Sequence, residues 1–228
     1  MRAREFLFGM AFLLVAMDVT AANPKPKPNT KPEDDIVSRE RGPKTDLVLE
    51  DDVFSSAYYD VVKILNAANR CSEFFGGPTT INIFDRMVAQ TQKNYLSADI
   101  GIRMSGKTEN ITDKRTNRAF RLFEKISING NGPFYRGRLF SFAPSAKGVG
   151  SYKPATREAR ALMLLHELGH LVTTDDGKWL LPNDGSDEGL SRRNSTKIET
   201  ICGKEIAALG AAEGKTEVTA SAGKAKPD

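Results

Sequence analysis

The spacing of apolar residues predicts a helix near the start of the central region. Between Ser55 and Phe75, apolar side chains recur at steps of three and four residues, which places them on one face of a helix. These positions are Tyr58, Val61, Val62, Leu65, Ala68 and Cys71. The pair Gly76-Gly77 predicts the end of this helix. A second, shorter helix is expected within residues 80–93.

Alternation of apolar and polar residues predicts strands in the middle of the chain. The clearest alternation covers residues 119–129, with a slip near Glu124. Weaker alternation predicts a strand in residues 98–104, and a second strand or an extended segment in residues 134–142. The polar stretch 106–118 between them predicts a loop.

A broad apolar face predicts a central, mostly buried helix in the last third of the chain. This helix should start near Thr156, after Pro154, and end before Gly177. Gly169 lies inside it, where glycine costs roughly 1 kcal/mol relative to alanine. Its missing side chain would let another backbone approach the helix closely.

The ends of the chain lack the composition of a folded domain. Residues 1–22 combine a basic start, a short apolar run and small residues, which predicts a secretory signal peptide. Residues 23–45 are rich in proline and charge and predict a disordered linker. Residues 211–228 predict a disordered tail. One α+β domain is therefore expected at residues 46–210.

Charge and cysteine content narrow the choice of partners and compartment. The formal net charge of +4 is small, and basic and acidic residues are interspersed, which argues against nucleic-acid binding. After the signal, no segment predicts stable membrane insertion. Cys71 and Cys202 favour one disulfide in an exported chain, with free thiols or a cysteine metal ligand as alternatives. We therefore expect a secreted, periplasmic or extracellular protein.

The candidate chemistry lies in the stretch His166-Glu167-Leu168-Gly169-His170. Two histidines four residues apart share one face of a helix and can bind one zinc ion. Glu167 can accept the proton of an attacking water as a general base. The chain contains 2 histidines in total, and both belong to this motif.

The stretch from Met163 to Val172 resembles the active-site helix of the zincin metallopeptidases. This resemblance implies a zincin-like fold, in which a small mixed or antiparallel sheet packs on a central metal-binding helix and further helices. It also implies Zn²⁺ as cofactor, a peptide or protein substrate and Glu167 as catalytic residue. In zincins a strand edge ahead of the metal helix binds the substrate backbone, which would place that edge within residues 126–142.

A catalytic zinc takes three protein ligands, and three carboxylates compete for the third position. Asp184 follows two leucines and a proline, an apolar anchor that could fold it back under the helix. Glu199 is placed like the gluzincin ligand, on a following helix with Asn194 or Ser195 as N-cap. Asp176 has the metzincin spacing, although the glycine and methionine features of that branch are missing. Asp184 ranks first, and the other two remain alternatives.

Two functions from different classes fit these observations. The first is a secreted zinc metallopeptidase that hydrolyses peptide bonds. The second is a secreted binding or structural module with a zincin-like fold and no turnover. In the enzyme, an oxyanion would need a tyrosine (Tyr135 or Tyr152) or an arginine such as Arg192 or Arg193, because no third histidine exists.

Overall fold

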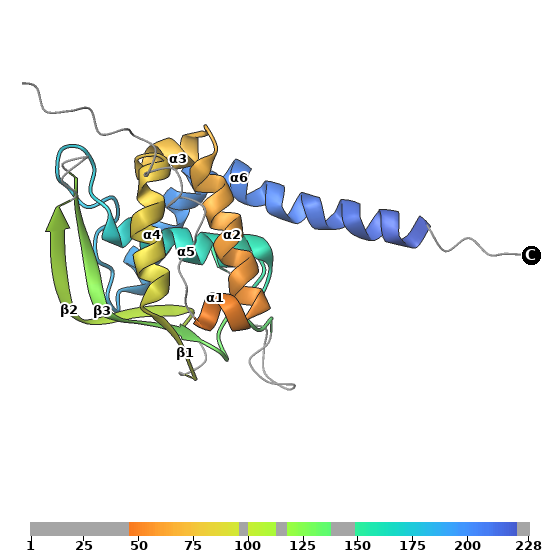
Figure 1. Cartoon of the computed structure of the whole chain (residues 1–228), viewed down its shortest axis with the longest axis horizontal. Helices are drawn as coiled ribbons and strands as arrows, with labels where there is room; N and C mark the ends of the chain where they lie inside the picture. The colour runs from red at the N-terminus through yellow and green to blue at the C-terminus, as the bar shows by residue number, and fades with distance from the viewer. Residues whose placement is uncertain (1–45, 96–99, 113–117, 138–148, 223–228) are drawn as a thin grey trace, which may run out of the picture. The chain divides into compact units, whose positions relative to one another are not determined.

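The structure, a computed structural model, describes residues 46–95, 100–112, 118–137 and 149–222. The predicted signal peptide and linker lie outside the described residues. The fold is mixed α+β (Figure 1). Its elements in chain order are α1 (Asp46–Glu50), α2 (Asp52–Asn66), α3 (Arg70–Phe75), the 3-10 helix η2 (Pro78–Thr80), α4 (Ile81–Ala89), β1 (Thr91–Asn94), β2 (Ile102–Thr112), β3 (Ala119–Asn129), α5 (Arg157–Leu171) and α6 (Glu188–Ala222).

The three strands form one small mixed sheet in the order β1-β3-β2. β1 pairs with β3 in parallel, and β2 pairs with β3 antiparallel. β3 covers the residues of the clearest predicted strand, so that prediction is confirmed. The slip near Glu124 has a structural cause, because a bulge at Gly106 and Lys107 in β2 lies opposite it. Glu124 Oε2 accepts a hydrogen bond of 3.2 Å from Lys107 N.

The prediction for β2 was only partly right. The strand was expected at residues 98–104 and starts at Ile102. It then continues to Thr112 and includes residues from 106 onward that were expected in a loop. It lies at the edge of the sheet, and most of its side chains are exposed. A strand exposed on both faces shows no apolar alternation, so its pattern resembled that of a loop.

β3 is the central strand, which corrects two further expectations. Residues 126–128 of β3 pair with β1 on one side and β2 on the other, and Asn129 N donates a hydrogen bond to Gly101 O, so this segment offers no free edge to a substrate. Residues 134–137 form a turn instead of a strand, with Tyr135 N and Arg136 N both bonded to Gly132 O. Residues 138–142 lie outside the described residues.

The predicted helix at 55–75 is two helices, α2 and α3, because Asn69 interrupts it. The Asn69 side chain accepts a hydrogen bond of 2.8 Å from Ser72 N and donates one of 2.8 Å to Ile64 O. It thus caps the start of α3 and satisfies a carbonyl at the end of α2. Apolar spacing continues across this break, so periodicity could not reveal it. The second predicted helix is α4, followed by the short strand β1, which was not predicted.

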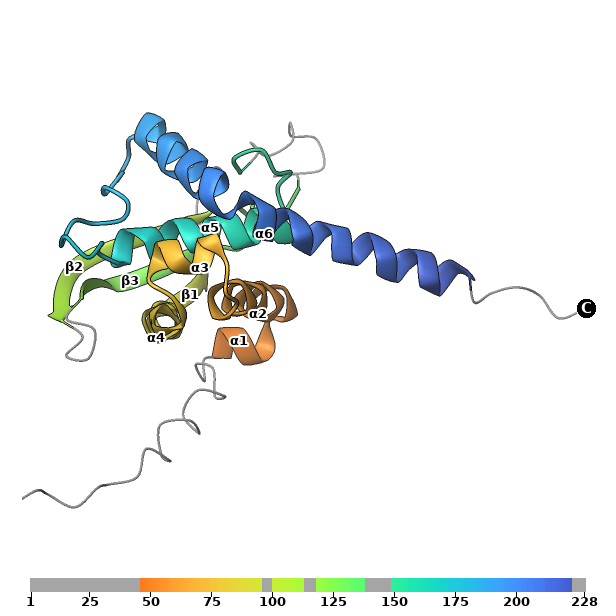
Figure 2. The same cartoon turned by 90° about the horizontal axis from the view of Figure 1, so that it is seen from above.

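α5 is the central helix of the described fold, as predicted. It contacts α2, α4, α6 and β3 (Figure 2). The hydroxyl of Thr156 accepts a hydrogen bond from Ala159 N and caps its first turn. The predicted disulfide is also confirmed, since Cys71 in α3 is bonded to Cys202 in α6.

α6 starts earlier in the chain than expected. The Asp187 carboxylate accepts a hydrogen bond of 2.9 Å from Leu190 N and caps this helix. The expectation that Asn194 or Ser195 would be the cap was therefore wrong, and both lie inside α6. The helix runs on to Ala222 and enters residues 211–228, which were predicted to be a disordered tail. Among the described residues, no helix has the length and apolar character to cross a membrane.

Candidate metal centre

The two histidines of the motif lie side by side near the end of α5. Both are buried, with 6% of His166 and 2% of His170 exposed. Their Nε2 atoms are 3.0 Å apart, as the four-residue spacing on one helix face predicts. The helix therefore directs two nitrogen donors toward one point.

Gly169 allows the next segment of chain to cross α5 beside these histidines. After α5, Leu180 N bonds to Val172 O at 2.9 Å and Leu181 N bonds to Gly169 O at 3.0 Å. A Cβ atom at position 169 would lie 2.6 Å from Leu181 Cδ1, which is closer than side chains pack. The predicted role of this glycine is confirmed, and the crossing brings Asp184 to the motif.

Asp184 completes a triangle of donor atoms. Its Oδ2 lies 3.0 Å from His166 Nε2 and 3.4 Å from His170 Nε2. Tetrahedral zinc at about 2.0–2.2 Å from its ligands keeps neighbouring ligand atoms roughly 3.3–3.6 Å apart. The observed separations match this geometry to within a few tenths of an ångström. The group could therefore hold a metal ion.

The protonation states favoured by the surroundings also suit a cation. Burial lowers the pKa of His166, which keeps its imidazole neutral. Burial alone would raise the pKa of Asp184, but hydrogen bonds with His166 and then His170 outweigh it and lower the pKa. A neutral imidazole and an ionised carboxylate are the forms that bind metal.

Glu167 lies next to the donor triangle without belonging to it. It is partly buried, and the donor group includes His166, His170 and Asp184 but not Glu167. Burial, followed by the negative charge of Asp184, raises the pKa of Glu167 to about 8. A carboxyl group with such a pKa can take up and return a proton near neutral pH.

Groups from α6 and β3 surround the triangle. Ser195 Oγ lies 3.0 Å from His166 Nδ1, and Asn194 Nδ2 lies 3.3 Å from Asp184 Oδ2. Arg121 Nε in β3 donates a 2.5 Å hydrogen bond to His170 O, one of the carbonyls left without a helical partner at the end of α5. The guanidinium also stacks on Trp179, 4.4 Å from the ring centre.

Sequence reasoning did not assign these surrounding residues to the site, although one signal was available. Asn194, Ile198, Cys202 and Ile206 follow one another at steps of four along α6. The last three are fully buried, and Asn194 is 3% exposed. A polar residue on a buried helix stripe needs a hydrogen-bond partner. The stripe therefore indicated that Asn194 contacts another polar group inside the fold.

The alternative carboxylates are engaged elsewhere. Glu199 Oε1 accepts hydrogen bonds from the backbone N and the hydroxyl of Ser151. Asp176 is exposed and forms an ion pair with Lys178 at 2.7 Å. Of the three carboxylates considered, Asp184 is the one that lies with the two histidines. Its role as a metal ligand stays a prediction.

The tyrosines considered for oxyanion stabilisation have other neighbours. Tyr135 packs under Lys93, whose Nζ is 4.0 Å from the ring centre. Tyr152 OH is 3.5 Å from Gly203 O. Arg192 and Arg193 are exposed on α6. None of these four described residues forms a hydrogen bond, ion pair or ring contact with the donor triangle.

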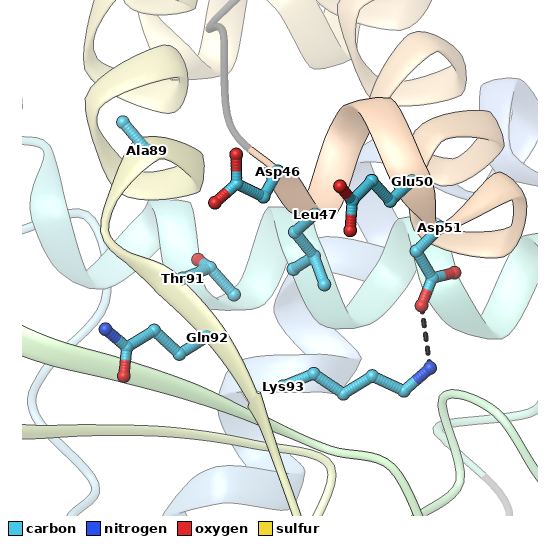
Figure 3. Close-up of a pocket in the computed structure, with 8 residues that line it drawn as sticks. All are labelled: Asp46, Leu47, Glu50, Asp51, Ala89, Thr91, Gln92 and Lys93. Carbon is cyan, nitrogen blue, oxygen red and sulfur yellow. Dashed lines mark hydrogen bonds and ion pairs between the residues drawn. The ribbon is translucent and has the colours of Figure 1, made fainter.

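A separate cavity of about 600 Å³ lies between α1 and β1 (Figure 3). Asp46, Glu50 and Asp51 contribute carboxylates to its lining, and Asp51 is bonded to Lys93 at 2.7 Å. Neither the donor triangle nor Glu167 lines this cavity. It is therefore a feature distinct from the candidate metal centre.

Comparison of the chain with protein-family models, curated proteins and solved structures found no match. What the site can do is therefore inferred from its own residues.

Proposed function

We propose that this protein is a secreted, zincin-type zinc metallopeptidase. The observation that carries the proposal is the convergence of His166 Nε2, His170 Nε2 and Asp184 Oδ2 within hydrogen-bond distance of one another, beside Glu167. The three donors leave a fourth tetrahedral position for a water or substrate. The Cys71–Cys202 disulfide supports export, since such bonds persist in oxidising compartments.

Each residue then has a distinct task. When bound, zinc supplies a Lewis acid that polarises a peptide carbonyl and acidifies water. Glu167 accepts the proton of the attacking water and returns it to the leaving amine. The partial burial of Glu167 limits its hydration, and its raised pKa suits both halves of this transfer. His166, His170 and Asp184 hold the ion and take no part in proton transfer.

The proposal is tested by separating the ligands from the base. Asp184→Asn should lower zinc occupancy and peptidase activity together, because an amide is a weak zinc ligand. Asp176→Asn is the matched control and should change neither, since Asp176 is exposed and bonded to Lys178. Glu167→Gln should keep its zinc and lose about 10²–10⁴-fold in rate. Elemental analysis and cleavage of a denatured protein substrate measure the two quantities.

Three outcomes would contradict the proposal. If the wild-type protein, purified from an exporting host, contained no zinc and took up none, the three residues would not form a zinc site. A zinc-loaded wild-type protein with no cleavage of any peptide library would instead favour the binding or structural module. A Glu167→Gln protein with full activity would place the reaction elsewhere.

A further inference from the structure

Two consecutive polar residues of α6 contact two different members of the donor triangle. Ser195 Oγ lies 3.0 Å from His166 Nδ1, the ring nitrogen that points away from the triangle. Asn194 Nδ2 lies 3.3 Å from Asp184 Oδ2 and donates a hydrogen bond of 3.0 Å to Pro182 O. One short stretch of helix thus contacts one of the two α5 ligands, His166, and the loop ligand, Asp184.

We propose that Ser195 and Asn194 are positioning residues that hold His166 and Asp184 in metal-binding geometry; this rests on the proposed zinc site. A histidine that binds metal through Nε2 carries its proton on Nδ1. Ser195 Oγ lies where it accepts the hydrogen bond from that proton. The contact is compatible with the tautomer of His166 that has a free Nε2 lone pair, and it fixes the angle of the ring.

Asn194 acts on the carboxylate in a complementary way. Its amide nitrogen carries two hydrogens, and Pro182 O and Asp184 Oδ2 lie at hydrogen-bond distance from it. The first contact holds the backbone of the loop two residues before Asp184. The second contact holds the carboxylate of Asp184 in its orientation toward the two histidines. Asn194 thus fixes both the position of the loop and the orientation of its carboxylate.

The element that carries this pair is anchored independently of any metal. Ile198 and Cys202 follow Asn194 at steps of four on the same stripe of α6, and both are 0% exposed. Cys202 is bonded to Cys71 in α3. Ser195 and Asn194 therefore stand on a packed, covalently tied helix, which is the arrangement that preorganises a site.

The second histidine offers an internal reference. His170 Nδ1 is buried and has no hydrogen-bond partner among the described residues. Removing Ser195 Oγ should therefore change the Nδ1 environment of His166 and leave that of His170 as it was. General disturbance of the helix pair would affect both rings.

Zinc affinity of the full chain, measured by competition with a chromophoric chelator, tests the inference. Ser195→Ala and Asn194→Ala should each weaken zinc binding by about 10–100-fold, and Ser195→Thr should restore most of the loss through its hydroxyl. Thr196→Ala is the matched control, since Thr196 is the exposed neighbour whose hydroxyl bonds to Arg192 O at 2.9 Å. It should bind zinc as the wild type does.

Nuclear magnetic resonance of the zinc-saturated proteins gives a readout that a merely structural role would not produce. The Nδ1 proton of His166 should exchange slowly with water in the wild type and faster in Ser195→Ala, with the His170 signals unchanged. Equal zinc affinity in Ser195→Ala, Asn194→Ala and Thr196→Ala would overturn the inference while the proposed function stands. A wild-type protein that binds no zinc would overturn both.

Discussion

At the scale of single residues, Gly169 connects the helix to the loop that carries Asp184. Its carbonyl accepts the Leu181 N–H at 3.0 Å, and the Leu181 side chain lies where a Cβ atom would be. Leu181 is fully buried, so it has little room to move aside. The position of Asp184, three residues later, therefore depends on the absence of a side chain at 169.

Gly169→Ala should destabilise the protein and weaken metal binding. Alanine favours a helix by about 1 kcal/mol over glycine, but overpacking a well-packed core costs about 1–3 kcal/mol. With Leu181 Cδ1 at 2.6 Å and Cγ at 2.7 Å from the new Cβ, the clash should win. We expect the free energy of unfolding in urea to fall by up to about 2 kcal/mol, together with lower zinc affinity.

Gly203→Ala in α6 is the control for this prediction. A Cβ atom there would have its nearest neighbour, Tyr152 Oη, at 3.9 Å, so no clash arises. The Gly203→Ala substitution should raise the free energy of unfolding by up to about 1 kcal/mol through helix propensity. If the Gly169→Ala protein were as stable as the Gly203→Ala protein, the Leu181 side chain would be able to move aside without a loss of stability.

At the scale of elements, the disulfide fixes α6 to α3 across a sequence separation of 131 residues. Both sulfurs are fully buried, and α6 carries the residues that contact His166 and Asp184. The bond therefore limits how far α6 can move from α5. It also removes entropy from the unfolded chain, and this effect grows with loop length.

Replacing both cysteines by alanine should lower the free energy of unfolding by about 2–5 kcal/mol. Urea unfolding of the Cys71→Ala Cys202→Ala protein measures the loss. Reductant should leave the variant unchanged and should bring the wild type, once unfolded, to the level of the variant. An unchanged unfolding midpoint would mean that the bond does not constrain the unfolded chain.

At the scale of the whole molecule, the pKa values of two carboxyl groups at different interfaces are shifted in opposite directions. Burial alone would raise the pKa of Asp51, but hydrogen bonds from Lys93 and Phe54 N outweigh it and lower the pKa. Asp51 thereby links the start of α2 to β1. Burial raises the pKa of Asp85 in α4, and the hydrogen bond from Tyr58 OH opposes this only in part.

The two groups should therefore contribute opposite pH dependence. A lowered pKa in the folded state stabilises it above the unfolded pKa of about 3.9, and this stabilisation disappears as pH falls through the folded pKa. A raised pKa means that the ionised group destabilises the folded state at higher pH. That destabilisation disappears as pH falls and the folded carboxyl takes up its proton.

Asparagine substitutions measured at about pH 7 and about pH 3 separate the two groups. Asp51→Asn should be less stable than the wild type at the higher pH, although asparagine keeps the helix cap. Asp85→Asn should be more stable than the wild type at the higher pH. Both differences should shrink at the lower pH, as urea unfolding can show. If both variants were more stable than the wild type at the higher pH, or both less stable, this assignment would be contradicted.

Local patterns in the sequence determined the parts of this protein that depend on neighbouring residues. The four-residue spacing of His166 and His170, with apolar flanks, predicted a buried helix with two convergent nitrogens. The alternation at residues 119–129 predicted β3, including its slip at Glu124. Such features are visible because helix and strand periods are set within a few residues of chain.

Tertiary structure alone decided which carboxylate joins the histidines. Asp176, Asp184 and Glu199 all follow the motif, and spacing could rank them but not choose among them. The packing of Leu181 on Gly169 brings Asp184 to the site, whereas Glu199 is directed to Ser151. Convergence of distant segments depends on side-chain packing across the core, which no local pattern in the chain records.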